Sequence, residues 1–510
     1  MLGGSLIFGA ASCTGKFEDF NTNPKAPTPE QMEGDFAYTA TLIGNMVPVV
    51  ALGQENDFQM IDQMIGCEYG RMTAAKNAWG TDGMFGNYNP RIGWQGIPFT
   101  TLMPNYMYTP YFKIRDVSGG EGLVYHWANL LRIFGTVRIS DCYGPTPFTM
   151  IGGGDSYQVE YDDMPDLYNA MFEELDASIA ALKEAAGSSM ASTLVANDYI
   201  YSGNVSKWVK FANTLKLRMA MRIVNANPAL AKQKAEEAAN DAGGLISEPG
   251  DAAWSSNIPG GNSLWKTSEA WNEGRISADI TSYMNGYNDP RLELYAQEDA
   301  NGNYNGLRNG IYLMTLADNG KDYSLTKTGQ QDKLLSISAS ESWFLRAEGA
   351  LRGWSMGGSA KELYEQGIAT SMSERGAQIG EYLNNTNTPA DYVDPNNSGY
   401  NIAAVTTICP KYDESASFET NLERIIAQKW LGNFPNGWES WADFRRTGYP
   451  KWFPVYNNLS TDGVSTTRGM RRIPFPQSEF NTNEANVKKA IQMLGGPDTG
   501  ATDLWWAKKN

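Results

Sequence analysis

The sequence predicts a mostly α-helical protein in which tetratricopeptide-like helix pairs flank a loop-rich irregular module. Three observations support this fold class. Apolar side chains recur with a helical period of about 3.6 residues in both halves of the chain. The periodic segments follow one another at about 30 residues, a spacing typical of tetratricopeptide-like units. Between residues 243 and 335, Gly, Asn, Asp and Tyr dominate instead, which indicates turns and loops.

The first half of the chain carries three long periodic segments. Gly122–Ile139, Asp166–Lys183 and Val205–Asn225 each place large apolar side chains on one helical face. Pro165 precedes the second segment, and Pro228 opens a further Ala-rich one, as suits a helix start. These segments predict helices that pack against one another.

Helices are predicted again after the irregular stretch, and they complete the domain organisation. The predicted helices are Ser340–Trp354, Lys361–Gly376, Phe418–Trp430, Trp438–Arg446 and Asn483–Leu494. We predict N-terminal helical units over residues 36–242, the irregular module over 243–335, and C-terminal helical units over 336–510 with an insert near 380–415.

The N-terminus predicts a lipid anchor. A short apolar stretch ends in small residues and Cys13, so we interpret residues 1–13 as a lipoprotein signal that ends at a lipidated Cys13. No Lys or Arg precedes the apolar stretch, which leaves a cytosolic N-terminus with a chance cysteine as the alternative. Residues 14–35 contain prolines and acids and predict an extended tether.

Composition excludes several function classes. The chain has 41 Lys and Arg residues against 57 Asp and Glu residues, and the net charge of −16 argues against a nucleic-acid partner. The single histidine, His126, lies in an apolar helical segment, where packing is the expected role, and it leaves no multi-histidine metal site. Cys67, Cys142 and Cys409 are widely spaced and predict free thiols, with one bridge among them as the alternative.

No spacing indicates a cofactor or a bound metal. An acidic chain is compatible with a structural cation such as calcium, but the segment that begins at Asp299 has Tyr304 and Gly310 where a calcium loop needs Gly and Glu. We interpret it as a surface turn.

Hydrolase motifs are also weak. Residues 353–357 match G-x-S-x-G, but the segment before them is helical and the only histidine lies upstream. A turn between helices explains this match. Two carboxylates can converge from any part of a chain, so a glycosidase stays open as an alternative.

Aromatic residues on loops are the candidate ligand contacts. Sugars stack their C–H faces on flat rings, while planar polar groups fix their hydroxyls. Two tryptophans lie in a Gly/Asn-rich loop and two in the irregular module. The predicted ligand-binding residues are Trp79, Trp94, Trp265 and Trp271, with Asn77, Asp82 and Arg275 as polar companions. Tryptophans at helical core spacing are assigned to packing: Trp127, Trp208, Trp343 and Trp430.

Several longer stretches occur in a familiar order. They include ISDCYGPTPF (139–148), NVSKWVKFANTLKLRMAMRI (204–223), SESWFLRAEGALRGW (340–354) and IIAQKWLGNFPNGWESWADFRRTGYP (425–450). Together they resemble the SusD/RagB family of outer-membrane nutrient-binding lipoproteins, particularly its SusD-like second branch. The GKFEDF stretch after Cys13 also resembles the acidic surface-export signal of such lipoproteins.

The resemblance implies a function. Such proteins are anchored by lipid at the cell surface and pass oligosaccharides to a SusC-like, TonB-dependent transporter; they are not enzymes. Capture of peptides, as in the RagB case, is the alternative. The matching motifs belong to the scaffold, and they imply that Trp208, Asn213 and Arg218 hold helices together. They also imply that Arg445 and Arg446 pair with buried acids or carbonyls. The site prediction therefore rests on the loop aromatics alone.

Overall fold

A computed structural model describes residues 37–78, 84–152, 158–188, 191–256, 260–315 and 318–507. The predicted signal, Cys13, the tether, Trp79 and Asp82 lie outside these residues. The architecture is helical with few strands, as the sequence predicts.

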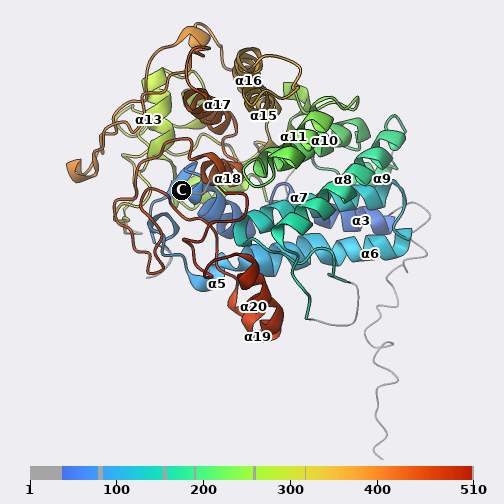
Figure 1. The fold of residues 1–510 in the computed structure, drawn as a ribbon. Helices are drawn as coiled ribbons and strands as arrows, with labels where there is room; N and C mark the ends of the chain where they lie inside the picture. Colours follow the sequence, from blue (N-terminus) through green and yellow to red (C-terminus); the bar gives the residue numbers. More distant parts are fainter. Residues whose placement is uncertain are drawn as a thin grey trace, which may run out of the picture.

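The N-terminal helices pack against one another largely in chain order. Helices α7 and α8 pack together, α8 also contacts α10, and α10 pairs with α11. Figure 1 shows α6, α7, α8 and α10 side by side along one side of the molecule. The bounds are α3 Ala37–Met46, α6 Thr109–Ser118, α7 Gly122–Tyr143, α8 Met164–Ala185, α9 Ser192–Asn197, α10 Val205–Arg222 and α11 Pro228–Ala239.

The C-terminal helices form a second group, in which α15 packs against both α16 and α17. Their ends follow local sequence: Ser359 caps the start of α16 in a reciprocal capping box with Glu362, and Gly376 ends it with a φ of 76°. The bounds are α15 Ala339–Leu351, α16 Ala360–Arg375, α17 Phe418–Gly432, α18 Gly437–Thr447, α19 Gln477–Thr482 and α20 Glu484–Met493.

Other elements are irregular or short, and the sequence did not predict them. Gln59–Cys67 (η2) and Pro98–Tyr108 (η4) are π-helical, and Ala278–Tyr287 (α13) is a regular helix within the segment where loops were expected. The short elements are η1 Val47–Val49, α4 Glu55–Phe58, η3 Phe85–Asn87, α5 Ile92–Gln95, η5 Pro249–Asp251, α12 Ser263–Trp265, η6 Lys266–Ala270, α14 Leu292–Tyr295, η7 Tyr382–Asn384 and η8 Ser398–Tyr400.

Two small antiparallel sheets connect distant parts of the chain. Thr73–Ala75 (β1) pairs with Gly274–Ile276 (β3), so that Ala74 lies opposite Arg275. Ala253–Ser255 (β2) pairs with Leu334–Ile337 (β4). The first sheet brings the segment after β1 next to the segment before β3.

The core confirms most of the packing predictions. Trp127, Trp208 and Trp430 are buried. Trp343 is half-buried and donates to the carbonyl of Ser247 at 2.8 Å. Asn213 donates to Asp241 at 3.1 Å and to the carbonyl of Gly244 at 3.0 Å. These tryptophans and Asn213 join helices to their neighbours, as expected.

Buried arginines also have the expected partners. Arg446 donates to Glu348 at 2.6 and 2.8 Å and to Asp443 at 2.9 Å. Arg445 instead donates to the carbonyls of Asp141, at 2.5 Å, and Arg471, at 3.0 Å. Each guanidinium is therefore held inside the helical frame, by carboxylates in one case and by carbonyl oxygens in the other.

Three smaller predictions can be checked in the described residues. Cys67, Cys142 and Cys409 are free thiols, and the first two are buried. The Asp299 carboxylate accepts from the backbone N–H groups of Asn301 at 2.8 Å and Asn303 at 3.0 Å, which makes the segment a turn. The half-buried His126 lies 3.5 Å from the Ser178 hydroxyl, and burial lowers its pKa.

Candidate ligand-binding site

A cluster of tyrosines forms an aromatic surface on the described loops. Tyr312 and Tyr456 are 62% and 50% exposed, and Tyr400 is half-buried. The Tyr456 ring lies 6.2 Å from that of Tyr312 and 5.1 Å from that of Tyr400, both edge-to-face. We call these three residues the tyrosine cluster. Exposed rings in contact offer flat faces to a ligand.

The tyrosine cluster is assembled from three connections that are far apart in the sequence. Tyr312 lies between α14 and β4, Tyr400 between α16 and α17, and Tyr456 between α18 and α19. A small satellite core beneath them consists of Ala74, Leu307, Ile311 and Tyr323, and Tyr400 packs against it. Loops that rest on their own apolar cluster keep a defined position.

Asn77 adjoins this surface. The backbone N–H of Met314 donates to the carbonyl of Lys76 at 2.9 Å, and Asn77 forms a bridge with Met314, two residues after Tyr312. Asn77 is 1% exposed, and its side-chain amide has no hydrogen-bond partner for either atom in the part of the chain that is described. A buried carboxamide with unused hydrogen-bonding capacity is unusual away from functional sites.

Arg275 and Lys76 hold the neighbouring loop. Arg275 donates to the carbonyls of Asn319, at 2.6 Å, and Gly320, at 3.2 Å, and Lys76 donates to the carbonyl of Asp318 at 2.5 Å. Burial lowers the pKa of Arg275 to about 10. Because the guanidinium is 1% exposed and bound to carbonyls, Arg275 is a residue that supports the loop from inside.

The predicted tryptophans are dispersed. Trp271 is half-buried. Its neighbour Asn272 donates to the Asn319 carbonyl at 3.2 Å, so Trp271 borders the loop that Arg275 supports. Trp265, at the end of α12, is half-buried too. Trp94 packs against the main core with the Arg91 guanidinium 4.7 Å from its ring centre. The structure therefore brings Asn77, Trp271 and Arg275 to one region and gives Trp94 a packing environment.

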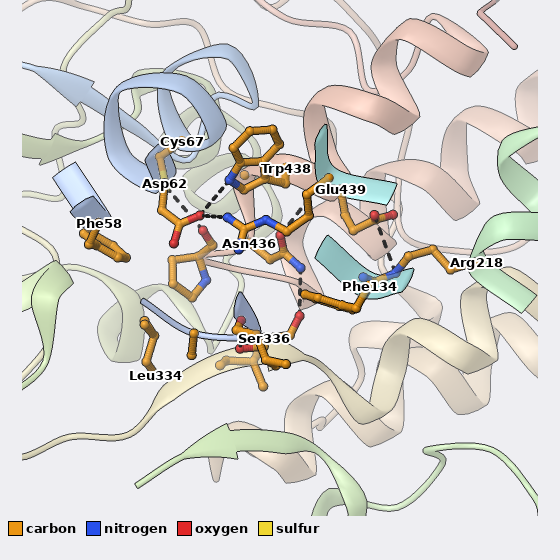
Figure 2. A pocket seen from close by; sticks show the side chains of 16 residues that line it. Phe58, Asp62, Cys67, Phe134, Arg218, Leu334, Ser336, Asn436, Trp438 and Glu439 are labelled. Atoms are coloured by element: carbon orange, nitrogen blue, oxygen red, sulfur yellow. Dashed lines mark hydrogen bonds and ion pairs between the residues drawn. The ribbon is translucent and has the colours of Figure 1, made fainter. Parts of the chain in front are cut away.

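A buried cavity, shown in Figure 2, is too small for a sugar. It has a volume of about 50 Å³ and lies between η2, β4 and the start of α18. Asp62 pairs with Arg138 and accepts from the indole of Trp438 at 2.6 Å, while Asn436 donates to the Ser336 carbonyl at 2.9 Å. Ligand pockets hold about 300–1,000 Å³. The groups around this cavity therefore serve packing.

A larger hollow of about 650 Å³ opens beside α12 and is lined by Leu264 and Trp254 among others. Its aromatic wall is already occupied, because the Arg375 guanidinium lies 5.0 Å from the ring centres of both Trp254 and Tyr295. The tyrosine cluster, with its exposed rings, is the better candidate for stacking.

The sequence analysis missed the tyrosine cluster. Tyr312 and Tyr456 lie in the segments RNGIYL and FPVYNN, which contain the turn-forming residue types Gly, Asn and Pro. Applying the loop-aromatic rule to tyrosine as well as tryptophan would have selected them. Their meeting on one surface depends on long-range folding, for which the sequence has no signal.

Two kinds of feature are absent from the described residues. No group of three or more His, Cys, Asp or Glu side chains is arranged to hold a metal ion. None of the helices there combines the length and apolar character required to cross a bilayer.

The helix pairs and the loop-built aromatic surface define an α-helical protein whose frame presents loops on its surface. A family model described as "SusD-like: Susd and RagB outer membrane lipoprotein" matches residues 19–507. The chain therefore belongs to the SusD-like family. A comparison with curated proteins finds no match.

Solved structures agree with the family. The chain is similar to a SusD-like protein from Bacteroides thetaiotaomicron, with 37% identity and a TM-score of 0.88 over 92% of this chain and 99% of that one. A SusD homologue from Bacteroides uniformis has 37% identity and a TM-score of 0.86 over 93% and 100%. A chitin-binding SusD homologue from Flavobacterium johnsoniae has 34% identity and a TM-score of 0.87 over 93% and 99%.

Proposed function

We propose that this protein is a lipid-anchored, cell-surface binding protein of the outer membrane that captures oligosaccharides and delivers them to a SusC-like, TonB-dependent transporter. Membership of a family of outer-membrane lipoproteins supports the location, and the chitin-binding relative supports a glycan as the ligand. In this proposal the protein has no enzymatic activity. The predicted anchor is Cys13, in the N-terminal segment.

The tyrosine cluster is the observation that carries the proposal. Two of its rings are at least half exposed, and Tyr312 lies two residues before Met314, which forms a bridge with Asn77, a buried residue whose carboxamide has no hydrogen-bond partner among the described residues. Rings that stack on sugar faces and a planar amide that bonds hydroxyls are the two chemical elements of glycan recognition. Trp79 and Asp82, which follow Asn77 closely in the sequence, remain proposed contacts, as do Trp271 and Trp265.

Isothermal titration calorimetry tests the proposal on the chain from residue 14 onward. The ligands are chitohexaose, cellohexaose, maltohexaose and a mixture of short peptides. Tyr312→Ala and Tyr456→Ala should each weaken oligosaccharide binding about tenfold, since a stacked ring contributes about 1–3 kcal/mol. Phe418→Ala removes a ring that is 39% exposed at the start of α17, outside the cluster, and should leave the affinity unchanged.

The peptide alternative makes a different prediction in the same experiment. Peptide capture depends on backbone pairing and side-chain pockets. Binding of the peptide mixture alone, with no response to any oligosaccharide, would replace the glycan proposal with a RagB-like one. Release of shorter sugars from the oligosaccharides would instead indicate a glycosidase.

A further inference from the structure

Asn87 connects two of the loops that carry the tyrosine cluster. It is 1% exposed, and its side-chain Nδ2 donates to the carbonyl of Ile311 at 3.0 Å and to the carbonyl of Asn457 at 2.8 Å. Ile311 directly precedes Tyr312, and Asn457 directly follows Tyr456. One carboxamide therefore fixes the backbone beside both exposed rings.

Backbone contacts bring the same segments close together. The N–H of Asn457 donates to the carbonyl of Gly310 at 2.7 Å, and the N–H of Leu459 donates to the carbonyl of Asn87 at 2.9 Å. Gly310 has a φ of 76°, and a Cβ there would lie 2.9 Å from the Gly86 carbonyl and would also clash with Val455. The loops approach too closely at this point for any side chain.

Arg308 connects the third tyrosine to the second. Its guanidinium donates to the carbonyl of Tyr400 at 2.7 Å and to the carbonyl of Pro454 at 2.9 Å, and it lies 5.8 Å from the Tyr456 ring centre. The side chain is buried, at 5% exposure. A rigid guanidinium fork can hold two carbonyls at a fixed separation, whereas a lysine amine cannot.

We propose that Asn87 and Arg308 are positioning residues that hold the three tyrosines in one arrangement and thereby set the affinity for an oligosaccharide. The inference rests on the proposed function of the tyrosine cluster. Neither residue touches the ligand. They order the loops before the ligand binds. Binding therefore does not have to overcome the conformational entropy that ordering the loops would cost.

The hydrogen-bond pattern favours positioning over general packing. Among the described residues the buried Oδ1 atom of Asn87 has no hydrogen-bond partner, so the side-chain hydrogen bonds seen there are those of its donor group, and that group is directed at the two tyrosine loops. Both acceptors of Arg308 likewise belong to segments next to cluster tyrosines. If Asn87 only filled space, an apolar side chain would do so without the cost of burying an acceptor that has no partner.

The first test examines the geometry without a ligand. Fluorotyrosine is incorporated and the ¹⁹F resonances of Tyr312, Tyr400 and Tyr456 are assigned from single Tyr→Phe variants. Asn87→Ala should shift both resonances, and Arg308→Lys should shift that of Tyr400. The control is Asn385→Ala, because Asn385 also donates to a carbonyl, that of Tyr287 at 2.6 Å, but away from the cluster. Unchanged resonances in a folded Asn87→Ala protein would overturn the proposal.

The second test measures affinity for chitohexaose by calorimetry in a double-mutant cycle. Asn87→Ala should weaken binding about tenfold in the wild-type background and by about threefold or less in the Tyr312→Ala background, because one of the two rings through which it acts is then absent. Equal losses in both backgrounds would show a general structural effect and refute positioning. If wild type binds no oligosaccharide, the proposed function fails, while the ¹⁹F result still decides whether Asn87 and Arg308 place the tyrosines.

Discussion

The guanidinium of Arg218 on α10 donates two hydrogen bonds of 2.8 Å to the carboxylate of Glu341 on α15, and both side chains are buried. This bidentate pair joins the N-terminal helices to the C-terminal ones. Lys429 on α17 lies 3.8 Å from the same carboxylate and 2.7 Å from Asp443 on α18. The two helical groups are therefore connected by buried charge as well as by apolar packing.

Removing one partner of this pair should be costly. Arg218→Ala removes both short hydrogen bonds from the buried Glu341 carboxylate and leaves only Lys429, at 3.8 Å, to balance its charge, so we expect the free energy of unfolding to fall by about 3–5 kcal/mol. Urea denaturation followed by circular dichroism measures the loss. Lys488→Ala breaks an exposed pair with Glu484 and should leave the stability almost unchanged. Similar losses in the two variants would contradict the structural role of Arg218.

Gly437 should not tolerate a side chain. A Cβ at this position would lie 2.5 Å from the Cα of Cys67 and would clash with the Gly66 carbonyl, because α18 crosses η2 there at backbone distance. We expect Gly437→Ala to lower the thermal midpoint by several degrees. Gly93→Ala is the matched control, since a Cβ there meets no atom within 4 Å. An unchanged midpoint for Gly437→Ala would show that the two elements are further apart.

Glu68 should make stability depend on pH. Burial raises its pKa from 4.5 to about 7, although Asn309 donates to it at 3.0 Å and Arg71 lies nearby. The folded protein therefore keeps a proton that the unfolded chain loses, and stability falls as pH rises from about 4.5 to about 7. Glu68→Gln cannot ionise and should flatten this part of the curve. Denaturation of wild type and Glu68→Gln at a series of pH values measures this dependence. Plots of stability against pH that run parallel for the two proteins would exclude an effect of Glu68.

The lipid anchor can be tested separately from binding. Cys13→Ala in the full-length chain, expressed with its native leader, should move the protein from the membrane fraction to the soluble fraction, because the modified cysteine would be lost. Cell fractionation and immunoblotting give the result. Cys409→Ala serves as the control, since Cys409 is a half-buried free thiol within the folded body. A Cys13→Ala protein that stays in the membrane fraction would rule out this anchor.

The helical frame could be predicted from the sequence because its signals are local. The apolar period of α8 and α10 and the capping residues of α16 determine those helices within a few residues of chain. The π-helical segments η2 and η4 were missed since a change of hydrogen-bond register leaves no clear apolar pattern. Helix α13 was missed because it lies among turn-forming residues.

The candidate site was predictable only in part. Asn77 and Trp271 adjoin the region that the structure indicates, because loop composition marks where a chain is free to hold a ligand. The burial of Arg275 could not be foreseen, since its carbonyl partners at Asn319 and Gly320 lie more than forty residues away. The same holds for the tyrosine cluster, whose members come from three separate connections.

The division of the tyrosine cluster among three connections has a practical consequence. Tyr312 and Tyr456 lie on opposite sides of α15, α16, α17 and α18 in the chain, so no continuous fragment shorter than this span contains both. A ligand that contacts both rings would recognise only molecules whose C-terminal helices have all assembled. Retention on an immobilised oligosaccharide would then measure the correctly folded fraction of a preparation, and could sort large variant libraries for folding without any antibody.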